Sequence, residues 1–299
     1  MSSAKRIALV TMSALPDWEV DDAPLVAALE AQGVEVSRPA WDAEGEDWSG
    51  YDVCLLRTTW DYQERAAEFL KWVEHAGAVT RLLNPLRVVE WNIQKTYLRE
   101  LEEDGARCIP TRWLKRGDRV SLDRLVREAG WAKGFIKPVV GANARETFRF
   151  ANDESDLKRV QGEVDRLLQT EDLMVQPYLA SVEDQGEVSA IFFDGEFSHG
   201  VRKIPKAGDY RVQDDWGASD EPWTPTEQQL GEVTKILECV EARCSPGERL
   251  LYARLDFLFL EDEALGLNEA EVIEPSLFFR HSAEAGARLA GALLRRCST

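Results

Sequence analysis

Two lysines stand in sequence settings that suit the binding of a large anion. Lys95 ends the segment Trp91-Asn92-Ile93-Gln94-Lys95, early in a predicted helix, and Lys137 lies within the predicted strand Phe135-Ile136-Lys137-Pro138. An ammonium group inside an apolar strand is costly unless it meets an anion. The phosphates of ATP are such an anion, and lysine serves them as a mobile point charge. The alternative is that both lysines are simply solvated.

The residues that follow Lys137 are small and suit a loop that approaches phosphate oxygens. Gly141 and Ala142 begin a run that continues to Thr147, and small side chains let backbone N–H groups come close to an anion. The chain has no GKS or GKT sequence, so this is not a Walker A loop. An ordinary hairpin loop is the alternative.

An apolar strand end followed by an acidic residue is a candidate adenosine site. Gln176, Tyr178 and Leu179 occupy the strand end, and Glu183 follows four residues after Leu179. Backbone groups here could bind the edge of adenine while side chains enclose its ring. The carboxylate of Glu183 could then accept hydrogen bonds from ribose hydroxyls. A strand end followed by a solvated glutamate is the alternative.

Acidic residues cluster in the last two predicted strands. Asp256 follows Arg254 in an otherwise apolar strand, and Glu269 and Glu271 alternate in the next one. Residues two apart share a strand face, so both glutamates point the same way. Like charges on one face are destabilising without a cation, and Mg²⁺ takes hard oxygen ligands while keeping water for substrate phosphates. The pattern predicts a magnesium site, with a solvated edge strand as the alternative.

A further polar segment, Arg57 to Tyr62, follows a predicted parallel strand at its carboxyl end, where ligands tend to bind. Arg57 could form a forked contact with a substrate carboxylate. The carboxylates of Asp21, Asp22 and Asp61 could bind an ammonium group, which would suit an amino-acid-like substrate. The alternative is a solvated turn.

The elements that must position these residues predict an α/β fold with three lobes. Strands and helices alternate in residues 1–90, which predicts a parallel-sheet lobe that binds substrate. Residues 91–172 are expected to form a small central α+β lobe, and residues 173–299 a C-terminal α+β lobe with an antiparallel sheet that carries the metal site. Asp194-Gly195 between two apolar runs is a hairpin signal. The expected helices are 23–32, 64–76 (ended by Gly77), 91–104, 121–129, 153–169, 226–243 and 283–296.

Composition excludes several classes of partner. The chain has 299 residues with 36 Lys and Arg against 54 Asp and Glu, a formal charge of −18. Such a negative field disfavours nucleic acid and anionic membranes. No apolar run approaches a membrane span, and the five cysteines lack the spacing of a zinc site or a disulfide framework. We expect a cytoplasmic protein that acts on small molecules, with a homodimer among the expected oligomeric states.

Together and in this order, the motifs resemble the ATP-grasp superfamily, as in glutathione synthetase and D-alanine–D-alanine ligase. The resemblance is carried by Trp91-Asn92-x-x-Lys95, Lys137-Pro138, Gln176-Pro177-Tyr178-Leu179, Lys203-Ile204-Pro205, Arg254-x-Asp256 and Glu269-x-Glu271. The sequence resembles more closely the branch that contains D-cycloserine ligase. That likeness is carried by Arg57-Thr58-Thr59-Trp60-Asp61-Tyr62, Asn84-Pro85, Gly208-Asp209-Tyr210-Arg211-Val212-Gln213 and Ile273-Glu274-Pro275-Ser276.

The resemblance implies a role for each group of residues. The ATP-binding set would be Lys95, Lys137, Gly141, Ala142, Gln176, Tyr178, Leu179 and Glu183. The ligands of two Mg²⁺ ions would be Asp256, Glu269 and Glu271. The catalytic cations would be Lys203, Arg254 and Arg211. The substrate side would contain Asp21, Arg57, Thr59, Asp61, Glu274 and Ser276.

Two departures from the family pattern concern the metal and the substrate loop. Glu271 stands where the family usually has asparagine, which makes the metal site more anionic. The Gly-Gly expected soon after Arg211-Val212-Gln213 is replaced by Trp216-Gly217-Ala218-Ser219. That replacement leaves the conformation of this loop open.

The implied activity is that of an ATP- and Mg-dependent ligase, an enzyme of secondary metabolism such as antibiotic biosynthesis. It would convert an amino-acid-like carboxylate into an acyl phosphate and couple it to an amine, forming an amide or a cyclic amide. Such chemistry needs positioning and charge more than a nucleophile, and its general base is not identified by the sequence. A cover against water is expected from residues 142–146 and 207–219. The alternatives are a ligase that joins two molecules and an inactive ATP-binding scaffold.

Overall fold

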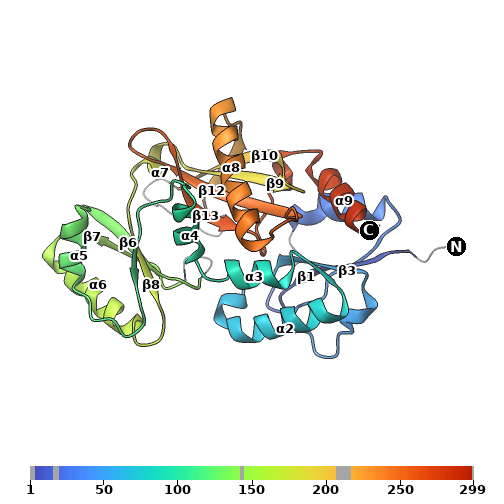
Figure 1. The fold of residues 1–299 in the computed structure, drawn as a ribbon, viewed down its shortest axis with the longest axis horizontal. Coiled ribbons are helices and arrows are strands. Elements are labelled where there is room, and N and C mark those ends of the chain that lie inside the picture. Colours follow the sequence, from blue (N-terminus) through green and yellow to red (C-terminus); the bar gives the residue numbers. More distant parts are fainter. Residues whose placement is uncertain (1–3, 16–19, 142–144, 207–216, 298–299) are drawn as a thin grey trace.

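Three sheets organise the molecule in the computed structural model, which describes residues 4–15, 20–141, 145–206 and 217–297 (Figure 1). The sheet formed by the first ninety residues is parallel, and the other two are antiparallel. The predicted α/β class with mixed sheets is therefore confirmed. Among the described residues, no helix combines the length and the apolar character that crossing a membrane requires.

The N-terminal sheet has the strand order β2-β1-β3-β4. Its strands are β1 (Arg6–Thr11), β2 (Glu35–Ser37), β3 (Val53–Thr58) and β4 (Arg81–Leu83), with α1 (Ala23–Glu30), α2 (Ala66–Val79) and the short helices η1 (Val20–Asp22), η2 (Trp48–Gly50) and η3 (Tyr62–Glu64). The expected end of α2 at Gly77 is wrong. The helix continues to Val79 because its buried face, which includes Phe69 and Val73, keeps it packed on the sheet.

The single helix expected from Trp91 to Asp104 is also wrong, since α3 (Leu86–Asn92) and α4 (Tyr97–Glu103) are separate. Asn92 Nδ2 donates to the carbonyl of Ala270 at 2.8 Å, and the backbone N–H of Val272 donates to Asn92 Oδ1 at 3.2 Å. The backbone N–H of Lys95 donates to the carbonyl of Val139 at 2.9 Å. These tertiary contacts break the helix and place Lys95 in the turn between α3 and α4.

The central sheet has the strand order β5-β8-β6-β7 and packs on its own two helices. Its elements are β5 (Arg112–Leu114), α5 (Leu122–Ala129), β6 (Lys133–Pro138), β7 (Phe148–Ala151), α6 (Glu154–Leu167) and β8 (Leu173–Pro177). Gly134 allows β6 and β8 to approach closely, because a Cβ atom there would lie 2.4 Å from both the Gln176 carbonyl oxygen and Phe150 Cζ. Residues of these helices and strands form a separate hydrophobic core.

The C-terminal sheet has the order β11-β10-β9-β12-β13. Its elements are α7 (Ser181–Asp184), β9 (Glu187–Phe193), β10 (Glu196–Ile204), β11 (Ser219–Trp223), α8 (Glu227–Cys244), β12 (Tyr252–Phe259), β13 (Leu265–Glu271), η5 (Phe279–His281) and α9 (Ala285–Arg296). The expected hairpin at Asp194-Gly195 joins β9 to β10, and β12 pairs with β13 as expected. One face of this sheet packs against α4 and α8 through apolar side chains such as Phe192, Leu255 and Phe257.

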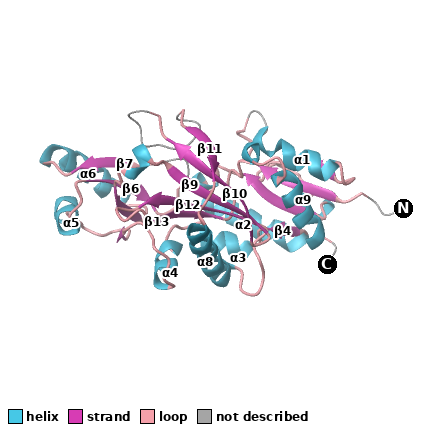
Figure 2. Ribbon diagram, turned by 90° about the horizontal axis from the view of Figure 1, so that it is seen from above, coloured by secondary structure: helices cyan, strands magenta, loops and turns pink. Residues whose placement is uncertain are grey.

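The N-terminal and C-terminal sheets share a continuous core. The C-terminal helix α9 packs beside α1 (Figure 2). Asn84 joins the lobes by polar contacts as well: its Nδ2 donates to the carbonyls of Tyr252 and Val272 at 3.0 and 2.8 Å, and its Oδ1 accepts from the N–H of Leu251 at 3.1 Å. The carboxyl end of the parallel sheet is thereby held against the end of β13.

Candidate active site

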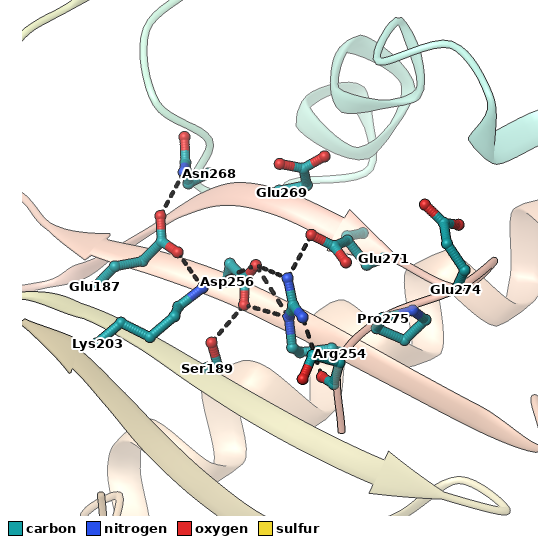
Figure 3. A network of polar contacts seen from close by, with 12 residues as sticks. Glu187, Ser189, Lys203, Arg254, Asp256, Asn268, Glu269, Glu271, Glu274 and Pro275 are labelled. Atoms are coloured by element: carbon teal, nitrogen blue, oxygen red, sulfur yellow. Dashed lines mark hydrogen bonds and ion pairs between the residues drawn. The ribbon is translucent and has the colours of Figure 1, made fainter. Parts of the chain in front are cut away.

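The face of the C-terminal sheet opposite α4 and α8 carries charged side chains (Figure 3). Pairing of β12 with β13 places Asp256 opposite Glu269 and Arg254 opposite Glu271. The pairing of β10 with β9 places Lys203 opposite Glu187. Because side chains alternate between the two faces of a strand, apolar residues of β12 reach the core and charged ones reach the other side.

Asp256 is the centre of this charged face and is almost fully buried, at 2% exposure. It accepts hydrogen bonds from Ser189 Oγ at 2.5 Å and Arg254 Nε at 3.0 Å, and Lys203 Nζ lies 3.3 Å from it. Burial would raise the pKa of Asp256, but the charges of Arg254 and Lys203 outweigh burial and lower its pKa to about 2. Asp256 is therefore ionised throughout the physiological pH range.

Three polar residues of this face were not predicted from the sequence. Glu187 pairs with Lys203 and accepts from Asn268 Nδ2 at 2.7 Å, and Ser189 donates to Asp256. Glu187 and Ser189 alternate with apolar residues at the start of β9. This alternation of polar and apolar residues is the sequence pattern that could have identified Glu187 and Ser189. Only the pairing of β9 with β12 shows that these two residues lie on the same face as Asp256.

Lys95, Lys137 and Glu269 converge on the edge of the same face. Lys95 and Glu269 form an ion pair, although they are 174 residues apart. Burial would raise the pKa of Glu269, but the charges of Lys95 and Lys137 lower it. The pKa of Lys137 is lowered, chiefly because it loses hydration and further because Lys95 repels it, against the opposing pull of Glu269. The two predicted phosphate-binding lysines and the acidic strand thus meet in one place.

Glu271 is paired with Arg254 but lies beside two other carboxylates. Arg254 contacts it, but burial and the neighbouring charges of Glu269 and Asp256 raise its pKa to about 7. Within the described ranges no three His, Cys, Asp or Glu residues already form a metal cluster, and each of the three carboxylates contacts a cation instead. The oxygen donors nevertheless fit Mg²⁺, because a bound divalent cation would relieve the repulsion that raises the pKa of Glu271.

The residues expected to frame adenine lie at the end of β8, beside β6. Gln176 is buried and donates from Nε2 to Thr111 Oγ1 at 3.0 Å. Tyr178 is half-buried beside the Phe135 ring, at 5.6 Å between ring centroids, and its hydroxyl contacts Glu183. Leu179 is half-buried and Glu183 is exposed. Glu183 therefore has its carboxylate available at the surface next to the aromatic pair.

Arg57 is buried together with Asp22, so the alternative of a solvated turn is wrong for Asp22. The exposure of Arg57 is 1%, and its Nε and Nη2 donate to the two carboxylate oxygens of Asp22 at 2.9 and 2.8 Å. Nη2 also donates to the Pro275 carbonyl at 3.1 Å. The fork that could bind a substrate carboxylate is occupied by Asp22. Arg57 Nη1 and Thr59 Oγ1 are buried and have no hydrogen-bond partner among the residues that the structure describes.

The other substrate-side candidates have several different environments. Asp21 accepts from the backbone N–H groups of Phe279 and Arg280, both at 3.1 Å, and Asp61 accepts from Trp41 Nε1 at 2.8 Å. These two carboxylates are engaged within the protein. Glu274 is buried beside the charged face, and the Ser276 carbonyl accepts from Arg254 Nη1 at 3.0 Å. Gly141 is described, whereas Ala142, Arg211 and most of the two expected cover segments lie outside the described residues.

Family models match two parts of the chain. The model described as the prokaryotic glutathione synthetase ATP-grasp domain matches residues 111–242, and the model of the N-terminal domain of D-cycloserine synthetase DcsG matches residues 7–84. The chain contains an ATP-grasp domain. It is similar, at 29% identity over 298 residues, to the cycloserine biosynthesis protein DcsG of Streptomyces lavendulae, an alignment that covers 97% of this chain and 98% of that protein.

Solved structures agree with this assignment. The crystal structure of D-cycloserine synthetase DcsG is similar with a TM-score of 0.87 and 28% identity, over 98% of this chain and 99% of that one. The D-alanine–D-alanine ligase of Bacillus anthracis complexed with ATP has a TM-score of 0.72 at 15% identity, over 99% and 98% of the two chains, which supports the fold. This ATP-grasp ligase is an ATP-dependent enzyme that joins a carboxylate to an amine, and its family typically uses Mg²⁺.

Proposed function

We propose that this ATP-grasp ligase phosphorylates the carboxylate of an amino-acid-like substrate and couples the resulting acyl phosphate to an amine. A carboxylate is a poor acyl donor, and transfer of the γ-phosphoryl group of ATP gives it a good leaving group. The observation that carries the proposal is the meeting of Lys95, Lys137, Lys203 and Arg254 with three carboxylates on one face. Phosphoryl transfer depends on such positioning and charge.

The proposed roles follow from place and charge. Lys95 and Lys137 hold the α- and β-phosphates, because both reach the edge of the acidic face from outside the C-terminal sheet. Lys203 and Arg254 stabilise the charge that develops on the transferred group, together with Arg211. Gly141 and Ala142 approach the phosphates, while Gln176, Tyr178 and Leu179 enclose adenine and Glu183 binds ribose.

Two Mg²⁺ ions are proposed at Asp256, Glu269 and Glu271. When bound, Mg²⁺ neutralises phosphate charge and orients the phosphates for transfer. In the ligand-free protein the same carboxylates are held by Lys95 and Arg254. These ion pairs hold the carboxylates and cations in place without leaving buried charges unpaired.

The proposed product is an amide or a cyclic amide in antibiotic biosynthesis. The similar protein and the similar crystal structure both bear the name DcsG and are described by cycloserine, a name that denotes a cyclised serine derivative. Ring closure would join the carboxyl carbon of such a molecule to its own side-chain nitrogen. The second candidate is the joining of two molecules, which the fold shared with D-alanine–D-alanine ligase favours. A cytoplasmic location and a homodimer are proposed as well.

The test is Mg²⁺-dependent release of ADP and phosphate with a panel that contains D- and L-serine, D- and L-alanine and O-amino-D-serine, followed by mass spectrometry of the products. Ring closure gives the mass of one substrate less one water, whereas joining gives the mass of two substrates less one water. Lys137→Ala should abolish substrate-dependent ADP release while the circular dichroism spectrum is retained. The absence of ADP release by the wild type across the panel would refute the proposal. Sedimentation velocity would test the homodimer.

A further inference from the structure

Glu274 is a buried carboxylate at the junction between the charged face and the N-terminal lobe. It follows β13 by three residues and is 8% exposed. Figure 3 shows its carboxylate on the same side of the sheet as Glu269 and Glu271. The adjoining backbone is fixed from the N-terminal lobe, since Trp60 Nε1 donates to the Glu274 carbonyl at 3.1 Å and Arg57 Nη2 donates to the Pro275 carbonyl at 3.1 Å.

Glu274 differs from the other carboxylates of the face in its contacts. Asp256, Glu269 and Glu271 each contact a cation. In the part of the chain that the structure describes, the Glu274 carboxylate makes no hydrogen bond or ion pair with another side chain. The titratable groups that act on it are Lys95 from the α3–α4 turn, Tyr62 from η3, Tyr252 from β12, and Glu269 and Glu271 from β13.

The second half of the ligation requires a proton acceptor at this junction. When the amine nitrogen bonds to the acyl carbon, the nitrogen becomes positively charged and its N–H becomes far more acidic. The acyl carbon must lie between the phosphate-binding cations and the lobe that holds the substrate. Lys95, which reaches the charged face, is close enough to lower the pKa of Glu274, and Trp60 of the N-terminal lobe donates to the Glu274 backbone carbonyl.

We propose that Glu274 is the general base that accepts the proton of the attacking amine. This inference rests on the proposed function. The nitrogen lone pair forms the new N–C bond, and the N–H proton passes to the Glu274 carboxylate. The bond between the acyl carbon and the phosphate oxygen then breaks, its electron pair leaves with inorganic phosphate, and the proton is released to solvent. No oxidant or further reactant is needed.

The protonation properties of Glu274 suit this task. Burial raises its pKa most, Glu271 adds to the increase, and Lys95 opposes it, so that the pKa is about 8. Magnesium bound at Glu271 would reduce the increase in the Glu274 pKa that comes from the charge of Glu271. It would not change the increase that comes from burial. A base with a pKa near the working pH accepts a proton from the acylated nitrogen and returns it readily to water.

The histidines are less suited to this role. His75 is exposed on α2, and His199 Nε2 lies 3.0 Å from the Leu277 carbonyl. His281 Nε2 contacts Asp220, which also binds Arg280. His281 is therefore held at the edge of the sheet by an anion. The experiment below includes His281→Gln to test whether His281 acts as the base in place of Glu274.

The experiment compares two acceptors for the same acyl phosphate. With ATP, Mg²⁺ and O-amino-D-serine, ring closure uses the enzyme's base. Added hydroxylamine at high concentration is small enough to lose its proton to water, and it traps the acyl phosphate as a hydroxamate. For Glu274→Gln we expect ring closure to fall by roughly a hundredfold or more, while hydroxamate and ADP formation stay within about threefold of the wild type.

The pH profile and two further variants complete the test. In the wild type, kcat/KM for ring closure should rise with pH through about 8, and Glu274→Gln should lose this rise. Glu274→Asp should recover part of the activity. Glu261→Gln, which removes an exposed carboxylate from the β12–β13 turn, should match the wild type in both reactions.

Three outcomes would overturn the assignment. Equal losses of ring closure and hydroxamate in Glu274→Gln would place the residue in phosphorylation or folding. Unchanged ring closure would remove it from the reaction, and the same selective loss in His281→Gln alone would transfer the role to His281. A wild type that forms neither ADP nor hydroxamate would refute the proposed function itself, and the inference with it.

Discussion

The buried ion pair between Arg57 and Asp22 should be costly to break by removal of one partner alone. Both side chains are 1% exposed and share two hydrogen bonds of 2.8 and 2.9 Å. Replacing Asp22 by Asn leaves a buried guanidinium without its counter-charge. Replacing Arg57 by Met leaves a buried carboxylate alone. We expect either change to be strongly destabilising, because an unpaired buried charge loses hydration without compensation.

The size of the effect can be estimated from the contact. Two unit charges about 4 Å apart attract each other by about 4 kcal/mol at an effective dielectric constant of about 20. Removing one member of a buried pair typically costs about 3–5 kcal/mol. For a protein of this size the loss corresponds to a decrease in melting temperature of roughly 10 °C. The double variant Asp22→Leu with Arg57→Met should regain most of this stability, because it leaves no buried charge.

Urea denaturation followed by tryptophan fluorescence would measure these differences. Arg124→Gln is the matched control, because Arg124 forms an exposed pair with Glu128 on α5, and it should leave the midpoint unchanged. The double variant should still have low ligase activity, since the Pro275 carbonyl loses its donor and the backbone of Glu274 loses an anchor. If the single variants have the same urea midpoint as the wild type, the predicted cost of breaking the ion pair is refuted. A double variant that is no more stable than either single variant would refute it as well.

Three further predictions concern the metal site, the adenine strand and pH. Glu271→Gln should weaken Mg²⁺ binding by about tenfold or more and ATP binding much less; identical Mg²⁺ titrations of ADP release would contradict the metal assignment. Gly134→Ala should lower the free energy of unfolding, measured by urea denaturation, by about 1–3 kcal/mol, because its Cβ would lie 2.4 Å from the Gln176 carbonyl oxygen. The control Gly162→Ala lies in α6, where a Cβ meets nothing within 4 Å, and it should stabilise the protein. Equal changes in the free energy of unfolding for the two variants would exclude the clash at Gly134. The pKa of Glu274 is raised from 4.5 to about 8, so the folded state binds the extra proton and its stability should fall as pH rises across that interval. Glu274→Gln should remove the part of this decline that Glu274 causes, most clearly above about pH 7, because Glu271, whose pKa is raised to about 7, contributes below that pH. An unchanged pH dependence of the urea midpoint would contradict this prediction.

Local patterns in the sequence were sufficient for most of the elements. The Asp194-Gly195 hairpin and the pairing of β12 with β13 follow from alternation and turn chemistry, and both were confirmed. The same alternation predicts that Glu269 and Glu271 share a face. Helix ends were less certain, because Gly77 is tolerated inside α2 by the packing of its neighbours.

Contacts between segments that are distant in the sequence could not be predicted from local sequence patterns. Lys95 lies in a turn because Asn92 and the Lys95 backbone bond to β13 and the β6 end, not because of its neighbours in sequence. Glu187 belongs to the charged face only because β9 lies between β10 and β12. Arg57 and Asp22 are 35 residues apart. The sequence predicted a substrate carboxylate for Arg57 and an ammonium group or a solvated turn for Asp22, and did not indicate that the two residues pair.

The sequence by itself determined the class of chemistry, since charged residues within apolar strands are retained only where another charge or a ligand compensates them. The order of those residues also matched one superfamily along nearly the whole chain. Only the tertiary structure decided which charges compensate one another. It assigned Asp22 to Arg57 and Glu269 to Lys95, and within the described residues it gave the Glu274 carboxylate no ion-pair partner. The physical reason is that side-chain electrostatics act over a few ångströms, and only folding sets which residues lie within that distance.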